Sequence, residues 1–258
     1  MKDLKARLDS LYKSFDFAHA IKEDPVHFPH RYRQDKDIEV SGFIASSFAY
    51  GNIRLFMPVI EKILNVMGKH PYEFLVNFSI QKHACLFQGI RYRFQKTEDI
   101  IAFLYVISVM LKRYGSIYKL FKRFYRDEDP DIGSALLGMM ADIRSSVNGG
   151  NVLSRGFLQL FPSPSGGSAF KRANLFLRWM VRDRDIDFGI WKGIPKNKLI
   201  IPLDTHIARL GSHIGLTTRT TNDWKMAVEI SSALKKIDPE DPLKYDFVLC
   251  HTERGTIS

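Results

Sequence analysis

The chain has 258 residues, a formal charge of +10 and two cysteines. That length can bury a substantial core without metal or disulfide support, in one large domain or two closely packed ones. Cys85 and Cys250 lie far apart and form no CxxC pair, which argues against a disulfide framework, a zinc ribbon or an iron–sulfur cluster. The positive charge makes nucleic acid the leading partner class, although an acidic membrane surface would be attracted by the same charge.

The first residues, MKDLKARLDSLYKSFDF, are charged and amphipathic, whereas a secretory signal has an uninterrupted apolar core. No later stretch reaches about 18 apolar residues without a charge. We therefore expect a soluble, cytoplasmic protein that does not enter a membrane.

Apolar residues recur at three and four positions along most of the chain, which predicts an all-α fold. Residues 37–70 are expected to form two helices with a break at Gly51 and Asn52. Residues 97–115 show the clearest helix, with Thr97 as the expected N-cap and basic residues in the last turn. Further helices are predicted over 116–126, 131–145, 168–182, 204–215, 222–236 and 242–250.

Three stretches break the helical pattern: YRDEDPD at 125–131, FPSPSGG at 161–167 and GIWKGIPKNKLIIP at 189–202. The second and third bracket one predicted helix. Elsewhere, GIRYRFQK at 89–96 interleaves basic and aromatic residues, which suits phosphate contact and base stacking and equally suits a solvated helix face.

The segment IIPLDTHIARLG at 200–211 places Asp204 directly before a predicted helix. An Asp there ordinarily acts as an N-cap, whose carboxylate accepts hydrogen bonds from the first helical amides, and capping alone stabilises by about 1 kcal/mol. Capping alone therefore explains an Asp at position 204. A second role for Asp204 depends on the segment upstream of it.

That upstream segment, SPSGGSAFKRANLFLRWMV, places Gly166 and Gly167 in a tight turn. The helix that follows is expected to begin near Ser168 and to carry Lys171 and Arg172 in its first turn. Glycines let backbone amides approach a phosphate closely, and a helix N-terminus adds partial positive charge. The turn can therefore bind phosphate; the alternative is a plain loop between helices.

The runs KRANLFL and PLDTHIARLGSHIGL resemble the helix-hairpin-helix (HhH-GPD) DNA glycosylase superfamily, which includes endonuclease III and the archaeal-type 8-oxoguanine glycosylases. Within it, the chain resembles a family of bacterial proteins of unknown function related to these enzymes. The resemblance is strong over residues 160–216, weaker over 37–66 and 222–255, and absent over 67–160.

The resemblance implies a two-lobed helical fold with a helix-hairpin-helix motif, in which Lys171 is the amine nucleophile and Asp204 the acid. Residues 1–36 and 150–258 would form the catalytic lobe, and residues 37–149 a helical bundle. Where the family has an LPGVG-type hairpin, this chain has PSPSGGSAF, and no four-cysteine cluster follows. The implied cofactors are therefore limited to a monovalent cation at the hairpin.

The same interpretation assigns a set of residues to DNA contact: Gly166, Gly167, Ser168, Arg172, Lys196, Lys198 and His206. For the lysines, solvated loop charges are the alternative. A base that leaves the duplex needs a pocket with stacking and hydrogen-bonding groups, for which we expect Trp191, Tyr50 and Asn52. Trp191 has an alternative role as a lid that packs on the core.

The histidines do not predict a metal site. His206 and His213 are seven residues apart on one helix face, which holds their rings about 10 Å apart along the axis, too far for one ion. We therefore expect no metal.

These observations favour a glycosylase that removes a damaged base from duplex DNA as a monomer, with abasic-site cleavage through a Lys171 Schiff base. One alternative is a non-catalytic protein that binds DNA or RNA, and another is a protein-interaction scaffold. The joint presence of Lys171 and Asp204 favours the enzyme. The hypothesis predicts that their side-chain ends face one cleft and lie within about one water molecule of each other.

Overall fold

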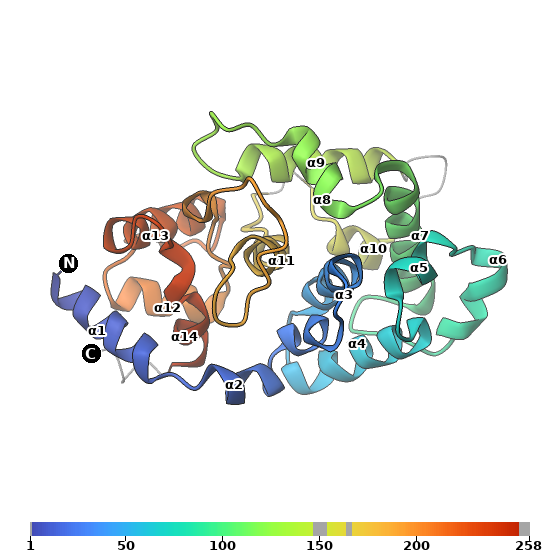
Figure 1. The fold of residues 1–258 in the computed structure, drawn as a ribbon, viewed down its shortest axis with the longest axis horizontal. Coiled ribbons are helices and arrows are strands. Elements are labelled where there is room, and N and C mark those ends of the chain that lie inside the picture. The colour runs from blue at the N-terminus through green and yellow to red at the C-terminus, as the bar shows by residue number, and fades with distance from the viewer. Residues whose placement is uncertain (1, 147–153, 164–166, 253–258) are drawn as a thin grey trace. The chain divides into compact units, whose positions relative to one another are not determined.

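A computed structural model of the protein describes residues 2–146, 154–163 and 167–252 (Figure 1). Throughout these ranges the regular structure is helical, and an isolated antiparallel bridge between Tyr92 and Gln95 is the one β-type pairing. The all-α prediction is therefore confirmed.

The chain divides into two compact units. We call residues 23–128 and 134–166 the middle unit, and residues 1–22, 129–133 and 167–258 the terminal unit. The sequence-based division placed its boundaries at 36–37 and 149–150. The structure instead groups 23–36 with the middle of the chain, because the 3-10 turns in this segment pack on α3.

The middle unit contains helices of very different lengths. They are α3 (Asp35–Phe48), α4 (Ile53–Met67), α5 (Pro71–Val76), α6 (Ile80–His83), α7 (Thr97–Tyr114), α8 (Ile117–Phe124), α9 (Gly133–Ser145) and α10 (Arg155–Leu160), with 3-10 turns η2 (Pro25–His27), η3 (Pro29–Arg31) and η4 (Ala84–Phe87). The first residue of α9 belongs to the terminal unit.

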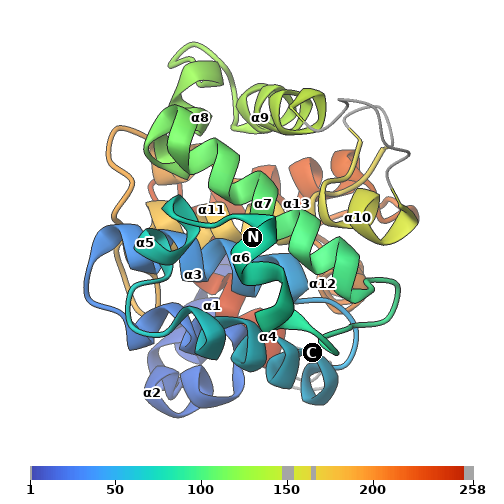
Figure 2. The ribbon, with the colours of Figure 1, turned by 90° about the vertical axis from the view of Figure 1, so that its right-hand side faces the viewer.

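Helix α3 lies in the core of the middle unit, where it contacts α4, α5 and η3. Residues 37–48 are all buried, so α3 has no solvent-facing stripe. The buried carboxylate of Glu39 accepts hydrogen bonds from the amides of Ile117 (2.9 Å) and Tyr118 (2.8 Å). It thereby satisfies two free amides at the start of α8, where negative charge also complements the helix dipole. Helix α7 lies beside α5 and α10 (Figure 2).

The ends of these helices follow the sequence closely. The expected break at Gly51 and Asn52 is present, and the Asn52 side chain caps α4 by accepting from the Arg54 amide (2.9 Å). The expected N-cap at Thr97 is wrong by one residue. Thr97 is the first helical residue and its hydroxyl donates to Ile90 O, whereas the carboxylate of Asp99 accepts from the Lys96 amide at 2.8 Å.

The terminal unit joins the start of the chain to its last third. Its helices are α1 (Lys2–Ser14), α2 (Phe17–Ala20), α11 (Lys171–Val181), α12 (Thr205–His213), α13 (Trp224–Ile237) and α14 (Asp246–His251), with η1 (Ile21–Glu23), η5 (Lys196–Lys198) and η6 (Pro242–Tyr245). Helix α12 contacts α14, and η6 contacts both α13 and α14. Tyr245 of η6 donates a hydrogen bond to Asp9 of α1 (2.7 Å), which fastens the first helix to the unit.

Among the helices within these ranges, none is long and apolar enough to cross a membrane alone. Helices α7 and α8 would pass that test of length and composition only as a pair, and they are bent by 71° relative to each other.

Candidate functional site

Lys171 is the first residue of α11, and the residue before it holds an unusual backbone. Phe170 has φ +49° and ψ +34°, a left-handed conformation that is uncommon for a residue with a bulky side chain. Its ring is buried and meets Trp224 edge to face at 6.1 Å. The side-chain amide of Asn174 donates to Ala169 O at 3.0 Å and ties the turn to the helix. These contacts fix the direction in which α11 presents Lys171.

Asp204 is the N-cap of α12, as expected. Its Oδ1 accepts a hydrogen bond from the amide of Ile207 at 2.9 Å. Its Oδ2 lies 3.6 Å from Nζ of Lys171. One carboxylate therefore caps a helix with one oxygen and pairs with a lysine through the other.

The lysine–aspartate pair is accessible as well as close. The side chains of Lys171 and Asp204 are 30% and 35% exposed, so a ligand can reach both. The two ends are closer than one intervening water requires, which meets the distance that the sequence-based hypothesis demanded. The catalytic roles of both residues stay predictions.

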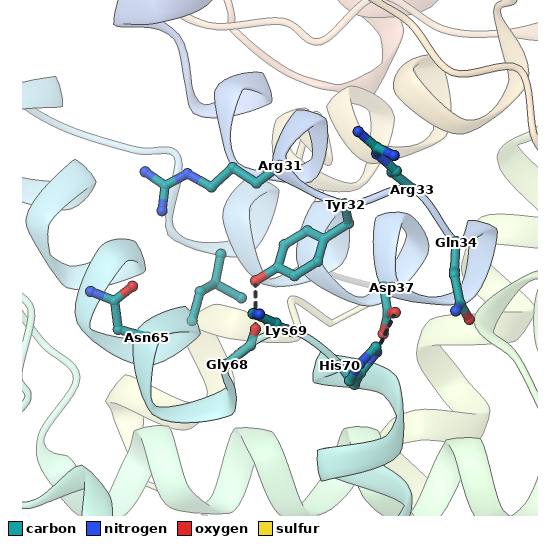
Figure 3. A pocket seen from close by; sticks show the side chains of 10 residues that line it. Arg31, Tyr32, Arg33, Gln34, Asp37, Asn65, Gly68, Lys69 and His70 are labelled. Carbon is teal, nitrogen blue, oxygen red and sulfur yellow. Dashed lines mark hydrogen bonds and ion pairs between the residues drawn. The ribbon is translucent and has the colours of Figure 1, made fainter.

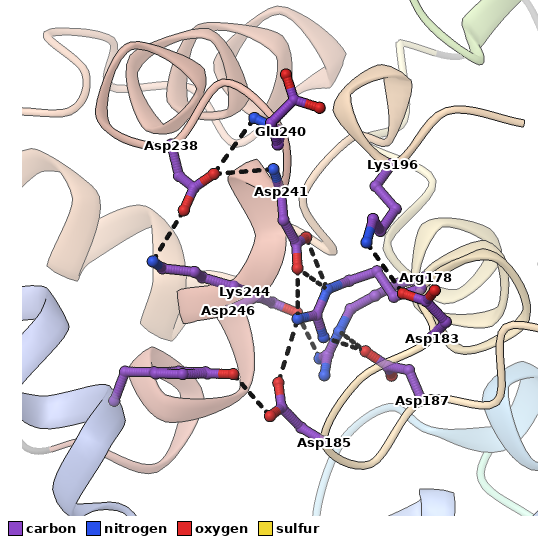
Figure 4. A network of polar contacts seen from close by, with 12 residues as sticks. Arg178, Asp183, Asp185, Asp187, Lys196, Asp238, Glu240, Asp241, Lys244 and Asp246 are labelled. Atoms are coloured by element: carbon purple, nitrogen blue, oxygen red, sulfur yellow. Dashed lines mark hydrogen bonds and ion pairs between the residues drawn. The ribbon is translucent and has the colours of Figure 1, made fainter.

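A buried charge network lies in the same unit (Figure 4). Arg178 lies in the last turn of α11 and Arg182, four residues later, is the C-cap of that helix; both are almost fully buried. Arg178 Nη1 lies 2.8 Å from Asp246 Oδ2, and Arg182 pairs with Asp241 at 2.8 Å. Both arginines also bind Asp187, with Arg178 Nε at 3.3 Å. Buried ion pairs of this kind are costly to break, because removing one partner leaves an unpaired charge in the interior.

The network connects electrostatically to the pair at the surface. Burial raises the pKa of Asp246, and the nearby negative charge of Asp204 raises it further, while Arg178 lowers it. Burial raises the pKa of Asp187 to about 6, against the opposing effect of both arginines. The start of α14 is therefore close enough for its charge to interact with that of Asp204.

The predicted DNA-contact residues have varied placements. Gly167 is exposed with φ +66°, which suits a glycine turn, whereas Gly166 lies outside the described residues. Ser168 Oγ accepts from the amide of Phe170 at 3.2 Å. Arg172 is half-buried beside Lys171 on α11.

Two of the residues predicted to contact DNA, Lys196 and His206, have polar partners within the protein. Lys196 Nζ pairs with the exposed carboxylate of Asp183 at 3.0 Å. A ring nitrogen of His206 lies 3.0 Å from the carbonyl of Leu249 and links α12 to α14. Lys198 is half-buried in η5, and its carbonyl accepts from Ile132. These contacts give each residue a role in the structure. Its role in DNA binding stays a prediction.

The predicted base-pocket residues are divided between the two units. Trp191 is 2% exposed and meets Phe176 edge to face at 5.3 Å, while its amide donates to Met180 O. The ring is buried, which favours the core-packing alternative; its place in a base pocket stays a prediction. Tyr50 and Asn52 belong to the middle unit, where Tyr50 donates to Gln95 and Asn52 caps α4.

Sequence reasoning missed the buried arginines, because charged residues in an amphipathic helix are ordinarily solvated. A signal was present in RWMVRDRDID, where two arginines lie four residues apart on one face of the helix predicted over 168–182 and three aspartates follow. Like charges at that spacing repel unless carboxylates lie between them.

The described ranges contain no group of three or more His, Cys, Asp or Glu side chains that could hold a metal ion. The site thus consists of a lysine and an aspartate that meet at the starts of two helices in an all-α protein.

The model of DUF2400, a protein family of unknown function, matches residues 24–254, and the chain belongs to that family. No curated protein and no solved structure matches it.

Proposed function

We propose that this protein is a DNA base-excision glycosylase with abasic-site lyase activity, in which Lys171 is the nucleophile and Asp204 its proton acceptor. The observation that carries the proposal is the 3.6 Å separation of Lys171 Nζ and Asp204 Oδ2, both partly exposed. The positive charge of the chain supports DNA as the substrate. The resemblance of the segments around both residues to the HhH-GPD glycosylases supports the reaction type.

A lysine amine is mostly protonated at pH 7, so it needs a base before it can attack. In the proposed reaction Lys171 Nζ passes a proton to Asp204 and bonds to C1′ of the damaged nucleotide. The bond from C1′ to the base breaks, and its electron pair leaves with the base, which takes up the proton that Asp204 accepted. The nitrogen then gives a second proton to the ring oxygen as the bond from C1′ to that oxygen opens, and a protonated Schiff base forms. Loss of a 2′ proton expels the 3′ phosphate by β-elimination.

The alternative, a nucleic-acid-binding protein without chemistry, is favoured by the 89–96 stretch in the middle unit. It is a two-residue turn rather than a helix face: Tyr92 and Gln95 exchange backbone hydrogen bonds of 2.8 and 2.9 Å. At its tip Arg93 has φ +48°, and Phe94 is 47% exposed. The guanidinium groups of Arg93 and Arg155 lie 5.8 and 5.2 Å from the centre of the Phe94 ring.

The two functions are separated by borohydride trapping on duplexes that carry an abasic site, oxidised guanine or no damage. We expect the wild type to form a covalent adduct on a damaged duplex, because borohydride reduces a Schiff base to a stable amine. Lys171→Ala should form none.

The matched control is Lys235→Ala, which removes an exposed lysine from α13 of the same unit and should trap as the wild type does. An adduct that survives Lys171→Ala would assign the nucleophile elsewhere. If the wild type gave no adduct on any duplex but bound DNA with an affinity that fell with salt, the binding function would replace the enzyme.

A further inference from the structure

A pocket of about 830 Å³ lies within the middle unit (Figure 3). One wall is the segment before α3, with Tyr32, Arg33 and Gln34, and the other is the loop from α4 to α5, with Gly68 and Lys69. The Tyr32 hydroxyl lies 3.4 Å from Gly68 O, and Gly68 turns the chain with φ +68°. The volume is within the range of about 300–1,000 Å³ typical of small-molecule sites.

The pocket carries positive charge that the protein does not neutralise. Arg31 on its rim is paired with Glu61 through two hydrogen bonds of 2.8 and 2.5 Å. Arg33 and Lys69, by contrast, are exposed and make no hydrogen bond or ion pair with the described part of the chain. Two cations with no partner in the described ranges thus border the pocket, which favours an anionic ligand.

The carboxylate that lines the same pocket is already engaged. Asp37 is buried, and its Oδ1 accepts from the amide of Tyr72 at 2.9 Å. Its Oδ2 lies 3.7 Å from Nδ1 of His70. Asp37 therefore fixes the loop before α5 rather than neutralising Arg33 or Lys69.

The remaining walls suit a flat, polar-edged group. The Tyr32 ring is half-buried and stands among the lining side chains, so one ring of a ligand can stack against it (Figure 3). Gln34 is the N-cap of α3 but makes no capping bond with its side chain, which leaves its amide able to hydrogen-bond a ligand. Leu64 supplies a buried apolar floor.

We propose that this pocket binds a nucleoside phosphate. Arg33 and Lys69 would hold the phosphate, Tyr32 would stack on the base, and Gln34 would contact the base edge. A free mononucleotide and the 5′-phosphorylated end of a nucleic-acid strand both carry this chemistry. The site uses neither Lys171 nor Asp204, so it extends beyond the proposed glycosylase activity and does not depend on it.

Calorimetric titration of the full chain with AMP at low salt tests the proposal. Arg33→Gln and Lys69→Gln should each weaken binding about tenfold, because each removes a charge-assisted hydrogen bond to the phosphate. Tyr32→Leu should weaken it through the loss of stacking. Lys62→Gln is the matched control: it removes one exposed charge from α4 outside the pocket and should leave the affinity unchanged.

The choice of probe decides the ligand class. We expect AMP to bind at least tenfold more tightly than either adenosine or inorganic phosphate. If adenosine bound as tightly as AMP, the phosphate contact would be wrong. If inorganic phosphate bound as tightly as AMP, base recognition would be wrong. If neither AMP nor a 5′-phosphorylated strand end bound, the whole proposal would be wrong. A 5′-phosphorylated tetranucleotide that binds far more tightly than AMP, and that Arg33→Gln weakens, would identify the strand end as the source.

The two proposals fail separately. Lys171→Ala should bind AMP as the wild type does, and Arg33→Gln should still be trapped by borohydride on short damaged duplexes.

Discussion

At the scale of single residues, Asp204 combines two roles that substitutions can separate. Its Oδ1 caps α12 and its Oδ2 faces Lys171. Asn is as good an N-cap as Asp, so Asp204→Asn should leave the melting temperature nearly unchanged, whereas Asp204→Ala should cost about 1 kcal/mol. Both variants should form the borohydride-trapped adduct with damaged DNA about 100- to 10,000-fold more slowly, because the proton acceptor is lost.

A second cap provides the control. Asp223 caps α13 in the same way: its Oδ1 accepts from the Met226 amide at 2.9 Å, and its Oδ2 pairs with Arg219 at 2.9 Å rather than with a lysine. Asp223→Ala should lose a similar amount of stability while trapping stays normal. If Asp204→Asn trapped at the wild-type rate, Asp204 would be a cap and nothing more.

At the scale of elements, we expect the 92–95 turn to contribute to the binding of single-stranded DNA. Base stacking on an aromatic side chain contributes about 1–3 kcal/mol, so Phe94→Ala should weaken binding of single-stranded DNA about 5- to 150-fold. Phe94→Trp should retain it. The measurement is fluorescence anisotropy with a labelled oligonucleotide at fixed salt.

The control for Phe94 is Tyr105→Ala on α7, because Tyr105 is also exposed (43%) and belongs to the same unit. Equal losses for Phe94→Ala and Tyr105→Ala would indicate a non-specific effect of exposed aromatics. An unchanged affinity for Phe94→Ala would remove the turn from any nucleic-acid interface.

Most helices could be predicted from the sequence because their signals are local. The break at Gly51 and the cap at Asp204 depend on residues adjacent in the chain. The turn at Arg93 could not be predicted, since alternating basic and aromatic residues carry no period that separates a turn from a helix face. The burial of Arg178 also escaped prediction, because its partner Asp246 is 68 residues away.

The candidate site was predictable in its residues and only partly in its surroundings. Lys171 and Asp204 were identified from two short motifs, and their proximity followed as a test of that hypothesis. The covering of Trp191 by Phe176 depends on how the 189–202 loop folds back on α11, which local sequence does not determine.

At the scale of the whole molecule, stability in acid should depend on the contact between the first helix and η6. A hydrogen bond from Tyr245 is the main cause that lowers the pKa of Asp9 from 3.8 to about 2, with Lys244 contributing. The stabilisation that results from the lowered pKa of Asp9 is complete above about pH 4. Between about pH 4 and pH 2 the unfolded chain takes up the proton first, so the contribution is lost as pH falls.

Melting temperatures measured between pH 5 and pH 2 should therefore fall less steeply for Asp9→Asn than for the wild type. Asp3→Asn is the control, because Asp3 is an exposed carboxylate on the same helix. A wild-type slope in Asp9→Asn would show that α1 does not contribute to acid stability.

The shared carboxylate of Asp204 also gives the site a built-in spectroscopic reporter. Because the Ile207 amide donates to Oδ1 of the same group whose Oδ2 faces Lys171, any change of charge or position at Oδ2 must alter that hydrogen bond. The chemical shift and solvent-exchange rate of this one amide would therefore register the arrival of a ligand at the lysine, in solution and without a label on the ligand.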